Sequence, residues 1–343
     1  MRKYISMLLA LLLTSSVCAT AANTKVVASG KIVSKEIKGI AGFKEIQTNS
    51  SVDVVYHSAA DIRIVVSASD NVIPYIEVVK KGSRLEVGLK KNINVRVKNS
   101  RADLKVNVYG PEVTAFSVKG SGGIRIATDL KADRLALGVS GSGDIDAYNL
   151  SAGEVALGVT GSGDIDVRNV SGKKIALGVT GSGDIECKAV SGDEVVLGVT
   201  GSGDIEVRNV SGKKIAIGVT GSGDIECKAV SGDVVALGVT GSGDVKVSSV
   251  ATDELACGVS GSGDIVVAAG TVGSANYGVT GSGDIKASSV IATEANAVAS
   301  GSGDISCRAT KQLSTAAMGS GNIYYYGNPA KVIGKNKRVK ARN

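Results

Sequence analysis

Apolar and polar residues alternate along the middle of the chain. Between Ile215 and Cys227, the odd-numbered positions carry Ile, Ile, Val, Gly, Gly, Ile and Cys, whereas the even-numbered positions carry Ala, Gly, Thr, Ser, Asp and Glu. A period of two residues is typical of a β-strand with one buried and one exposed face. Outside the extreme N-terminus, no helix-length stretch of the sequence shows a 3.6-residue period. We therefore expect strands to build this part of the chain.

The alternating pattern recurs every 20 residues. Gly-Ser-Gly-Asp stands nine times between Gly141 and Asp304, with less regular copies at Gly120 and Gly319. A fixed period predicts a solenoid, in which each coil buries its apolar face only by stacking on its neighbours and the terminal coils are atypical. With strands stacked about 4.8 Å apart, the sequence predicts an all-β parallel β-helix of about ten 20-residue coils, preceded by an irregular β-rich head.

The small residues of each coil predict its local geometry. Gly221 and Gly223 fall on the inward side, where a tight corner should leave no room for a Cβ, and Gly218 falls on the outward side. Ser211-Gly212 and its counterparts are expected to form the turn that closes the coil. One interior column is expected to contain Ile145, Ile165, Ile185, Ile205 and Ile225.

Two blocks of the repeats are nearly identical. Residues 161–200 and 201–240 match at 36 of 40 positions, which indicates a recent tandem duplication. A catalytic apparatus seldom survives such copying, whereas a spacer or a repeated surface does. This observation favours a function without catalysis.

Composition and charge exclude some partners. The chain is 43% apolar but has no Trp and only two Phe, so the core is expected to be aliphatic. The net charge of +7 is unevenly spread, because residues 119–322 hold 16 Lys/Arg against 23 Asp/Glu, whereas residues 323–343 hold six against none. No basic stripe with interleaved aromatic residues is present, so nucleic acid is not expected as a partner.

The N-terminus carries an export signal. Arg2 and Lys3 precede the apolar stretch from Met7 to Leu13, and Ala19-Thr20-Ala21 has the form of a cleavage site. Residues before Cys18 make a poor lipobox, so lipidation is not expected. No other stretch approaches the length of about 20 apolar residues that a membrane span needs. We expect an exported protein in the periplasm, on the outer-membrane surface or outside the cell.

Four cysteines remain after cleavage at this site. Cys187, Cys227 and Cys307 share one inward column at spacings of two and four coils, and Cys257 lies in a different column. Neighbours in the shared column are then at least about 10 Å apart, beyond the Cα separation of about 7 Å that a disulfide tolerates. We expect four buried thiols rather than disulfides.

The repeat aspartates form one outward column, with neighbouring carboxylates about 5 Å apart. This separation resembles that in retaining glycosidases, but catalysis needs two carboxylates in different environments and the repeats supply identical ones. Calcium is the better functional alternative, although the spacing differs from that of calcium-binding repeats. The favoured interpretation is that each carboxylate accepts hydrogen bonds from turn amides and the adjacent Ser hydroxyl, and no cofactor or metal is expected. The column comprises Asp144, Asp164, Asp184, Asp204, Asp224, Asp244, Asp264, Asp284 and Asp304.

Three further features are candidate sites. The Thr220 and Ser222 ranks form a flat face that resembles ice-binding solenoids, but the serine rank lacks the methyl groups of such faces, so packing against a protein or polymer, or self-association, is favoured. His57 is expected to be a surface turn residue, since no second His exists for a metal cluster. The basic segment 331–343 could attach to an anionic envelope surface, but a solvated, disordered end is favoured.

The order of several segments resembles the head GIN domain family. These segments are Gly42-Phe43-Lys44-Glu45-Ile46, Val52-Asp53-Val54-Val55, Asn71-Val72-Ile73-Pro74-Tyr75-Ile76, Leu85-Glu86-Val87-Gly88-Leu89-Lys90-Lys91, the Gly-Ser-Gly-Asp-Ile repeats and Ile323-Tyr324-Tyr325-Tyr326-Gly327-Asn328-Pro329. The family, common in Bacteroidetes, is labelled "putative auto-transporter adhesin". The resemblance implies a secreted, right-handed β-helix without known catalytic residues. The Lys/Arg-rich end lacks amphipathic barrel strands, so self-secretion is not expected.

The sequence therefore predicts four segments and a binding function. Residues 1–21 form a signal peptide, residues 22–118 the β-rich head GIN region, residues 119–322 the solenoid, and residues 323–343 a cap strand with a basic tail. We expect an exported, non-enzymatic adhesin whose partner is a surface protein or polysaccharide. The alternatives are a calcium- or glycan-responsive binding module and a structural envelope spacer. Because residues 119–322 contain only Tyr148 and Tyr277 as aromatic residues, glycan binding along the repeats is disfavoured, whereas the Tyr324–Tyr326 end stays open to it.

Overall fold

Strands make up nearly all the regular structure of this protein. The computed structural model describes residues 24–96 and 104–342, so the expected signal peptide and Cys18 lie outside the described residues. The chain divides into two compact units, Met1–Asn169 and Val170–Asn343. Within the described ranges the only helix is the short 3-10 helix η1 (Ile73–Tyr75), and no helix there is long and apolar enough to cross a membrane.

The N-terminal unit combines antiparallel pairs with a parallel stack. Its strands are β1 (Thr24–Val27), β2 (Ile32–Ile37), β3 (Glu45–Thr48), β4 (Asp53–Ser58), β5 (Arg63–Ser69), β6 (Ile76–Lys81), β7 (Arg84–Leu89), β8 (Ile93–Arg96), β9 (Leu104–Gly110), β10 (Ala115–Val118), β11 (Ile124–Ile126), β12 (Leu130–Val139) and β13 (Ile145–Val159).

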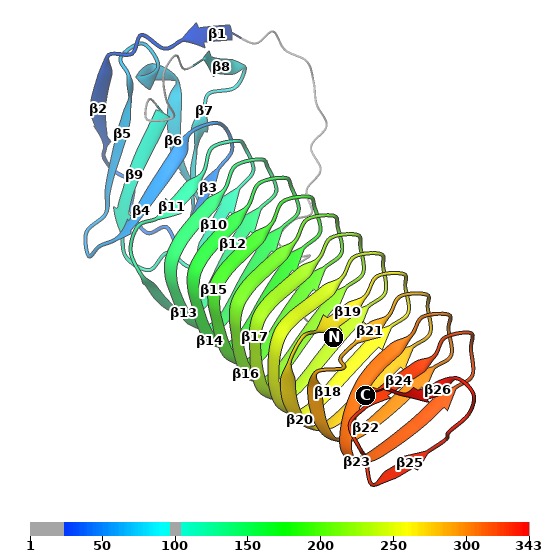
Figure 1. Ribbon diagram of the computed structural model, residues 1–343. Coiled ribbons are helices and arrows are strands. Elements are labelled where there is room, and N and C mark those ends of the chain that lie inside the picture. The colour runs from blue at the N-terminus through cyan, green and yellow to red at the C-terminus, as the bar shows by residue number, and fades with distance from the viewer. Residues whose placement is uncertain (1–23, 97–103, 343) are drawn as a thin grey trace. The chain divides into compact units, whose positions relative to one another are not determined.

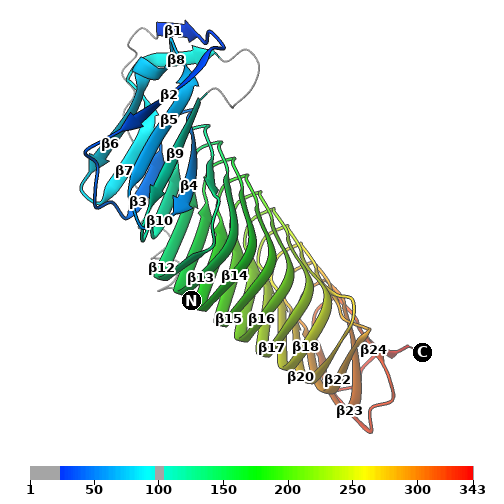
Figure 2. The ribbon, with the colours of Figure 1, turned by 90° about the vertical axis from the view of Figure 1, so that its left-hand side faces the viewer.

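Parallel stacking begins inside the segment expected to be the head. Strand β10 pairs in parallel with β3 on one side and with β12 on the other, as Figure 2 shows. Phe116 is thereby in register with Ile46, 70 residues earlier, and with Leu137, 21 residues later. Strand β11 is placed between β4 and β13 in the same way. Residues 45–58 thus supply a coil, whereas β2 and β6 add antiparallel pairs with β5 and β7.

The C-terminal unit is a parallel β-solenoid. Strand β14 (Ile165–Val179) runs across the boundary between the units. The strands that follow are β15 (Ile185–Val199), β16 (Ile205–Val219), β17 (Ile225–Val239), β18 (Val245–Val259), β19 (Ile265–Val267), β20 (Gly270–Val279), β21 (Ile285–Lys286), β22 (Val290–Ala299), β23 (Ile305–Ala317), β24 (Ile323–Tyr326), β25 (Lys331–Ile333) and β26 (Val339–Ala341).

The sequence period sets the register of this unit. Strands β15 to β18 lie side by side in order (Figure 1), and each residue pairs with its equivalent 20 positions away, as Ile205 does with Ile225. The side chains of the predicted interior column, Ile145, Ile165, Ile185, Ile205 and Ile225, are all fully buried. Burying each isoleucine contributes about 1.5–3 kcal/mol. The predicted all-β parallel solenoid is therefore confirmed, and its core is mostly aliphatic, although Tyr56, Phe116 and Tyr277 are also buried.

The predicted Ser-Gly turn is wrong. Ser211 and Gly212 lie inside strand β16, whose hydrogen-bonded ladder continues through them. The strand nevertheless bends there, because the buried positions change phase from Val207 to Val210 and again at Ile215. A ladder between coils tolerates such bends, since its hydrogen bonds run between strands rather than along one strand.

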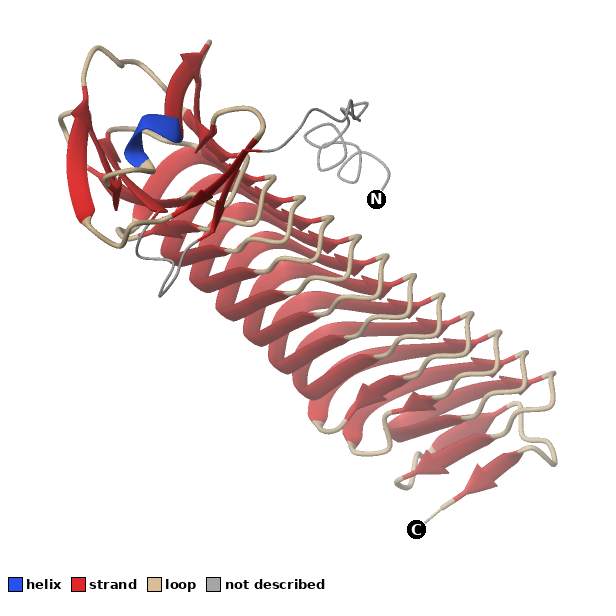
Figure 3. Ribbon diagram, turned by 90° about the horizontal axis from the view of Figure 1, so that it is seen from above, coloured by secondary structure: helices blue, strands red, loops and turns tan. Residues whose placement is uncertain are grey.

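The chain instead turns at the Gly-Ser-Gly-Asp motif. In Figure 3 these turns form a row of loops along the C-terminal unit. The amides of Ser222 and Gly223 both donate to the carbonyl oxygen of Gly201, at 2.9 and 3.2 Å. A Cβ added to Gly221 would approach that same oxygen closer than 3.0 Å, a contact that real Cβ atoms essentially never make. The predicted lack of room is present, but the obstacle is the backbone of the preceding coil rather than the interior of the corner.

The basic C-terminal segment is ordered, contrary to the expectation of a disordered end. Strand β25 pairs in parallel with β23, and β26 pairs in parallel with β24. The amide of Arg342 donates to the carbonyl oxygen of Tyr325 at 2.9 Å. Residues 331–342 therefore form the last coil of the solenoid, because their main chain continues the ladder even though the 20-residue period has ended.

Candidate binding surfaces

The repeat aspartates form a hydrogen-bonded ladder between coils. In the C-terminal unit the amide of Asp224 donates to Oδ1 of Asp204 at 2.6 Å, and the amide of Asp244 donates to Oδ1 of Asp224 at 2.8 Å. The N-terminal unit has the same bond between the amide of Asp164 and Oδ1 of Asp144. The further members linked in this way are Asp184, Asp264, Asp284 and Asp304.

The ladder differs from the predicted Asx-type turn in one respect. The carboxylate accepts a turn amide as expected, but that amide belongs to the next coil and not to its own turn. The bond therefore joins coils instead of closing a corner. It also continues beyond the nine regular repeats, because Oδ1 of Asp53 accepts the amide of Gly123 and Oδ1 of Asp304 accepts that of Asn322 in the less regular copy at Gly319. Asp53 was not predictable from the repeat pattern, since 70 residues separate it from Gly123.

Two lysines neutralise part of the ladder. Lys246 Nζ lies 3.0 Å from Oδ2 of Asp224 and 3.1 Å from Oδ2 of Asp244, and these hydrogen bonds raise the pKa of Lys246 above its ordinary value. Lys286 contacts Asp264 at 2.5 Å, which likewise raises the pKa of Lys286. Burial pushes the pKa of Asp264 up, but the bonds from Lys286 and from the Asp284 amide outweigh burial and leave it lowered. Lys286 Nζ also lies 3.7 Å from Oδ2 of Asp284, so four repeat carboxylates have a lysine beside them.

The candidate calcium column stays a prediction. Oδ1 of Asp204 is occupied by an amide, which leaves Oδ2 as its outward oxygen. Within the described ranges, no three His, Cys, Asp or Glu side chains gather in an arrangement that could hold a metal ion. The candidate calcium ligands are the repeat aspartates of the ladder, and removal of metal tests this role directly.

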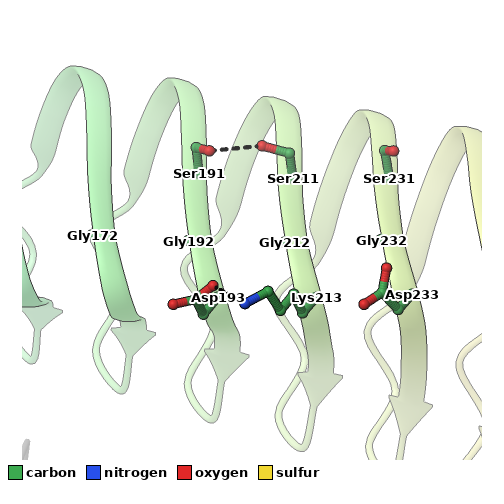
Figure 4. Close-up of a pocket in the computed structure, with 10 residues that line it drawn as sticks. All are labelled: Gly172, Ser191, Gly192, Asp193, Ser211, Gly212, Lys213, Ser231, Gly232 and Asp233. Carbon is green, nitrogen blue, oxygen red and sulfur yellow. Dashed lines mark hydrogen bonds and ion pairs between the residues drawn. The ribbon is translucent and has the colours of Figure 1, made fainter.

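A shallow groove of about 570 Å³ crosses the Ser-Gly positions of four coils. Its floor includes Ser191 and Ser211, whose hydroxyl oxygens lie 3.0 Å apart (Figure 4). Beside it, Lys213 Nζ lies 2.8 Å from Oδ1 of Asp193, and this hydrogen bond raises the pKa of Lys213 and lowers that of Asp193. Lys213 and Asp193 are thus paired with each other, whereas Asp233 adds a carboxylate to the lining, so the groove offers a ligand hydroxyl groups and one further acidic group.

The Thr and Ser ranks are exposed as predicted. Thr220 and Ser222 are both exposed, while their amides donate to Val199 and Gly201 of the preceding coil. A Cβ added to Gly218 beside them would come no nearer than 3.8 Å to another atom, which agrees with its outward position. The face stays the predicted candidate for self-association.

The cysteines are buried where the register placed them. Cys187, Cys227, Cys257 and Cys307 are all buried, and no disulfide joins any cysteine of the described ranges. Desolvation raises the pKa of Cys227 and Cys307 to about 12. Cys257 is in register with Tyr277, in a column distinct from that of Cys227.

The two tyrosines of the repeats do not form a sugar platform. Tyr277 is 2% exposed and its hydroxyl has no hydrogen-bond partner, whereas Tyr148 is 52% exposed. Tyr277 fits inside because the equivalent positions of the adjacent coils carry the smaller Cys257 and Ala297. Its burial removes one of the two rings that could have stacked on a glycan.

His57 is not a turn residue, contrary to the prediction. It lies in strand β4, in register with Tyr109 of β9, and the two rings stack with centroids 4.6 Å apart. Arg63 approaches the Tyr109 ring at 5.9 Å. The run Val52-Asp53-Val54-Val55-Tyr56 already alternates as a strand, and extending it by one residue includes His57.

Comparisons with known proteins give one family and several similar folds. The family model described as "Putative auto-transporter adhesin, head GIN domain" matches residues 42–229 and 213–329. A solved "putative adhesin" from Parabacteroides merdae is 17% identical, with a TM-score of 0.41 over 88% of this chain and 98% of that chain. A "putative lipid binding protein" from Parabacteroides distasonis is 21% identical, with a TM-score of 0.34 over 93% of this chain and 100% of that chain. Among curated proteins nothing matches the chain.

Proposed function

Because the chain belongs to the head GIN domain family, described as "putative auto-transporter adhesin", we propose that it is an exported, non-enzymatic adhesin. It acts outside the inner membrane by binding a surface partner. In this proposal the coils are a scaffold of adjustable length, and specific recognition is carried by the non-repetitive ends of the chain.

The observation that supports a scaffold is that the repeated Asp carboxylates bind main-chain amides of neighbouring coils. Each coil directs its Asp carboxylate at the amide of the next coil, and the same bond recurs from Asp184 to Asp304. General acid–base catalysis needs two titratable groups in different environments. A column of carboxylates that accept amides of neighbouring coils provides stacking energy more readily than such a pair.

Cell attachment tests the proposal. Cells that make the full-length protein, a matched strain without its gene, and the complemented strain are compared for adhesion to immobilised host matrix and to other bacterial cells. We expect adhesion to fall in the deletion strain and to be inhibited by added purified mature protein. Protease treatment of intact cells should degrade the protein if it is exposed on their surface. Equal adhesion of all three strains, together with resistance to protease on intact cells, would contradict the proposal.

A further inference from the structure

The C-terminal coils of the solenoid concentrate positive charge. Residues 305–342 contain eight Lys/Arg and no Asp or Glu. Strands β23, β24, β25 and β26 hold most of this segment in the parallel ladder. These charges are therefore carried by an ordered backbone, although the sequence alone suggested a solvated end.

Three strands of this segment share one outward face that mixes cations with tyrosine rings. Ser306, Tyr324 and Lys340 are in register on β23, β24 and β26, and Arg308 is in register with Tyr326. Ile323, which alternates with Tyr324, is fully buried, so Tyr324 and Tyr326 lie on the outward side. We call the outward set Arg308, Tyr324, Tyr326, Lys340 and Arg342 the terminal basic face.

The rings hold the cations in place. Lys340 Nζ lies 5.5 Å and the Arg342 guanidinium carbon 4.9 Å from the centroid of Tyr324. The Arg308 guanidinium carbon lies 5.9 Å from the centroid of Tyr326. Cations within about 6 Å of a ring are attracted to its face, and this restricts long side chains that would otherwise be mobile. A ligand that binds them then loses less conformational entropy of the protein.

The same outward positions are neutral in the coils of β16 and β17. There, Glu206 is followed two residues later by Arg208, and Glu226 by Lys228, so each of these two coils pairs one acid with one base. In the three coils that follow, the first position carries Lys246, Val266 and Lys286. At the end of the chain the pair becomes Tyr324 with Tyr326 and then Lys340 with Arg342.

The Asp rank also changes sign at the end of the chain. Asp304 is followed by Asn322, and the amide of Ile323 donates to the carbonyl oxygen of Arg338, where the preceding coil uses Asn322. Arg338 thus takes the position of the repeat aspartate. The last coil therefore carries a positive charge at a rank that is acidic in the repeats.

We propose that the terminal basic face binds an acidic polysaccharide. This inference rests on the proposed adhesin function and names the class of its partner. Guanidinium and ammonium groups recognise carboxylate or sulfate groups by charge-assisted hydrogen bonds. Strand rows about 4.8 Å apart, with side chains about 7 Å apart along each strand, offer a flat array of cations to an extended polymer.

A polysaccharide fits this face better than an anionic membrane. Peripheral membrane binding combines basic residues with apolar side chains that enter the headgroup region. Among the described residues the exposed large apolar side chains are Val27, Ile32, Tyr148, Ile291, Met318 and Ile333, and none of them belongs to the terminal basic face. Charge and tyrosine rings without an inserting side chain favour a soluble polyanion.

Binding of the full mature protein to defined probes tests the inference. The probes are alginate, neutral dextran of similar length, and vesicles of phosphatidylcholine with or without phosphatidylglycerol. The Lys340→Gln/Arg342→Gln variant removes two charges from the terminal basic face. The matched control, Arg208→Gln/Lys228→Gln, removes two charges from equivalent positions of the middle coils. Thermal melting of each variant confirms that the fold is retained.

We expect alginate to bind and dextran not to bind. The Lys340→Gln/Arg342→Gln variant should bind alginate at least about tenfold more weakly, since the loss of a hydrogen bond to a charged group is enough for such a factor. The control should change affinity by less than about twofold, as expected for charges distant from the contact.

Three results would overturn the inference. Equal weakening of alginate binding in the two variants would indicate diffuse attraction to net charge. Binding only to phosphatidylglycerol vesicles would identify a lipid surface as the partner. Failure to bind any polyanion would exclude acidic polysaccharides as ligands. Cell adhesion separates this inference from the proposed function. If the Lys340→Gln/Arg342→Gln variant loses alginate but still supports adhesion, the adhesin proposal stands and the assigned ligand is wrong.

Discussion

At the scale of single residues, the carboxylate of each repeat aspartate takes the place of a main-chain acceptor. The turn that contains Asp224 has no strand partner for its amide, and Oδ1 of Asp204 accepts it at 2.6 Å. The carbonyl oxygen of Asp224 accepts in turn from the amide of Ile205. One residue type thus restores hydrogen bonding where the ladder is interrupted, and unpaired backbone groups of this kind are costly.

Replacement of Asp204 should separate its acceptor role from its charge. Asp204→Ala leaves the Asp224 amide without its acceptor and should lower the free energy of unfolding by about 1–2 kcal/mol. Asp204→Asn retains an acceptor oxygen and should cost less than about 1 kcal/mol. Urea unfolding of both variants measures the difference. An equal loss in the two variants would show that the charge matters rather than the hydrogen bond.

The buried thiols should be unreactive while the protein is folded. Burial raises the pKa of Cys227 from about 9.0 to about 12, so little thiolate forms at pH 8. Iodoacetamide followed by mass spectrometry should find Cys187, Cys227, Cys257 and Cys307 unmodified in native protein and fully modified in guanidinium chloride. The unfolded thiol loses its proton first as the pH rises, so the thiols also lower stability between about pH 9 and pH 12. Rapid native labelling of any of the four would contradict their burial.

At the scale of the coil, close contact between successive turns dictates the sequence. Gly221 meets the backbone of Gly201, and Gly223 meets that of Gly203, so these positions exclude a Cβ. The charged rank beside the groove shows a second constraint, since Lys173, Asp193, Lys213 and Asp233 alternate in sign. In-register stacking places equivalent residues about 4.8 Å apart, where like charges repel. A block of 40 residues, or two coils, gives this rank its alternation of sign.

A pair of alanine substitutions tests the turn contact. Gly221→Ala forces a methyl group against the backbone of the preceding coil and should lower the free energy of unfolding by at least about 2 kcal/mol. Gly218→Ala is the matched control, because its Cβ would meet no atom closer than 3.8 Å. It should change stability by less than about 0.5 kcal/mol. Similar melting temperatures for the two variants would remove close stacking as the reason for the motif.

The repeat pattern predicts the coils well and their ends poorly. A fixed period and strict alternation predict the buried Ile205 column and the exposed Thr220 rank, because stacking repeats each environment. The pairing of Ile46 with Phe116 was not predictable from the period, since 70 residues separate them. The order of residues 331–342 was missed because composition suggested a solvated end, whereas ladder bonds to β23 and β24 decide their structure. Sequence also could not distinguish a carboxylate bond within a turn from one between coils.

At the scale of the whole molecule, charge is distributed by segment. The repeats between residues 119 and 322 are mildly acidic, whereas residues 323–343 carry six Lys/Arg and no acid. Charges in the middle coils meet partners, as Arg134 meets Glu154 at 3.2 Å and Lys246 meets Asp244 at 3.1 Å. The family match ends at residue 329, so the six Lys/Arg of residues 331–342 lie outside it. Recognition by charge is therefore expected at the C-terminal end.

Metal should be dispensable for the stability of the mature protein. If amides and lysines satisfy the Asp ladder, EDTA should leave the melting temperature within about one degree, because only a ligand bound by the folded state stabilises by mass action. Differential scanning calorimetry with EDTA and with added calcium measures this. A calcium-dependent rise of many degrees would support the calcium-responsive alternative.

Deletion of residues 201–240 tests most directly the claim that the coils are a scaffold and that recognition lies at the ends. The deletion joins Thr200 to Gly241, preserves the Thr-Gly-Ser-Gly-Asp junction, and shortens the stack by two coils, or about 10 Å. Each coil contacts only its neighbours, so the shortened protein should fold, be exported, support adhesion and bind alginate as the parent does. Loss of adhesion or alginate binding in a variant that still folds and is exported would contradict the account and assign recognition to the repeats.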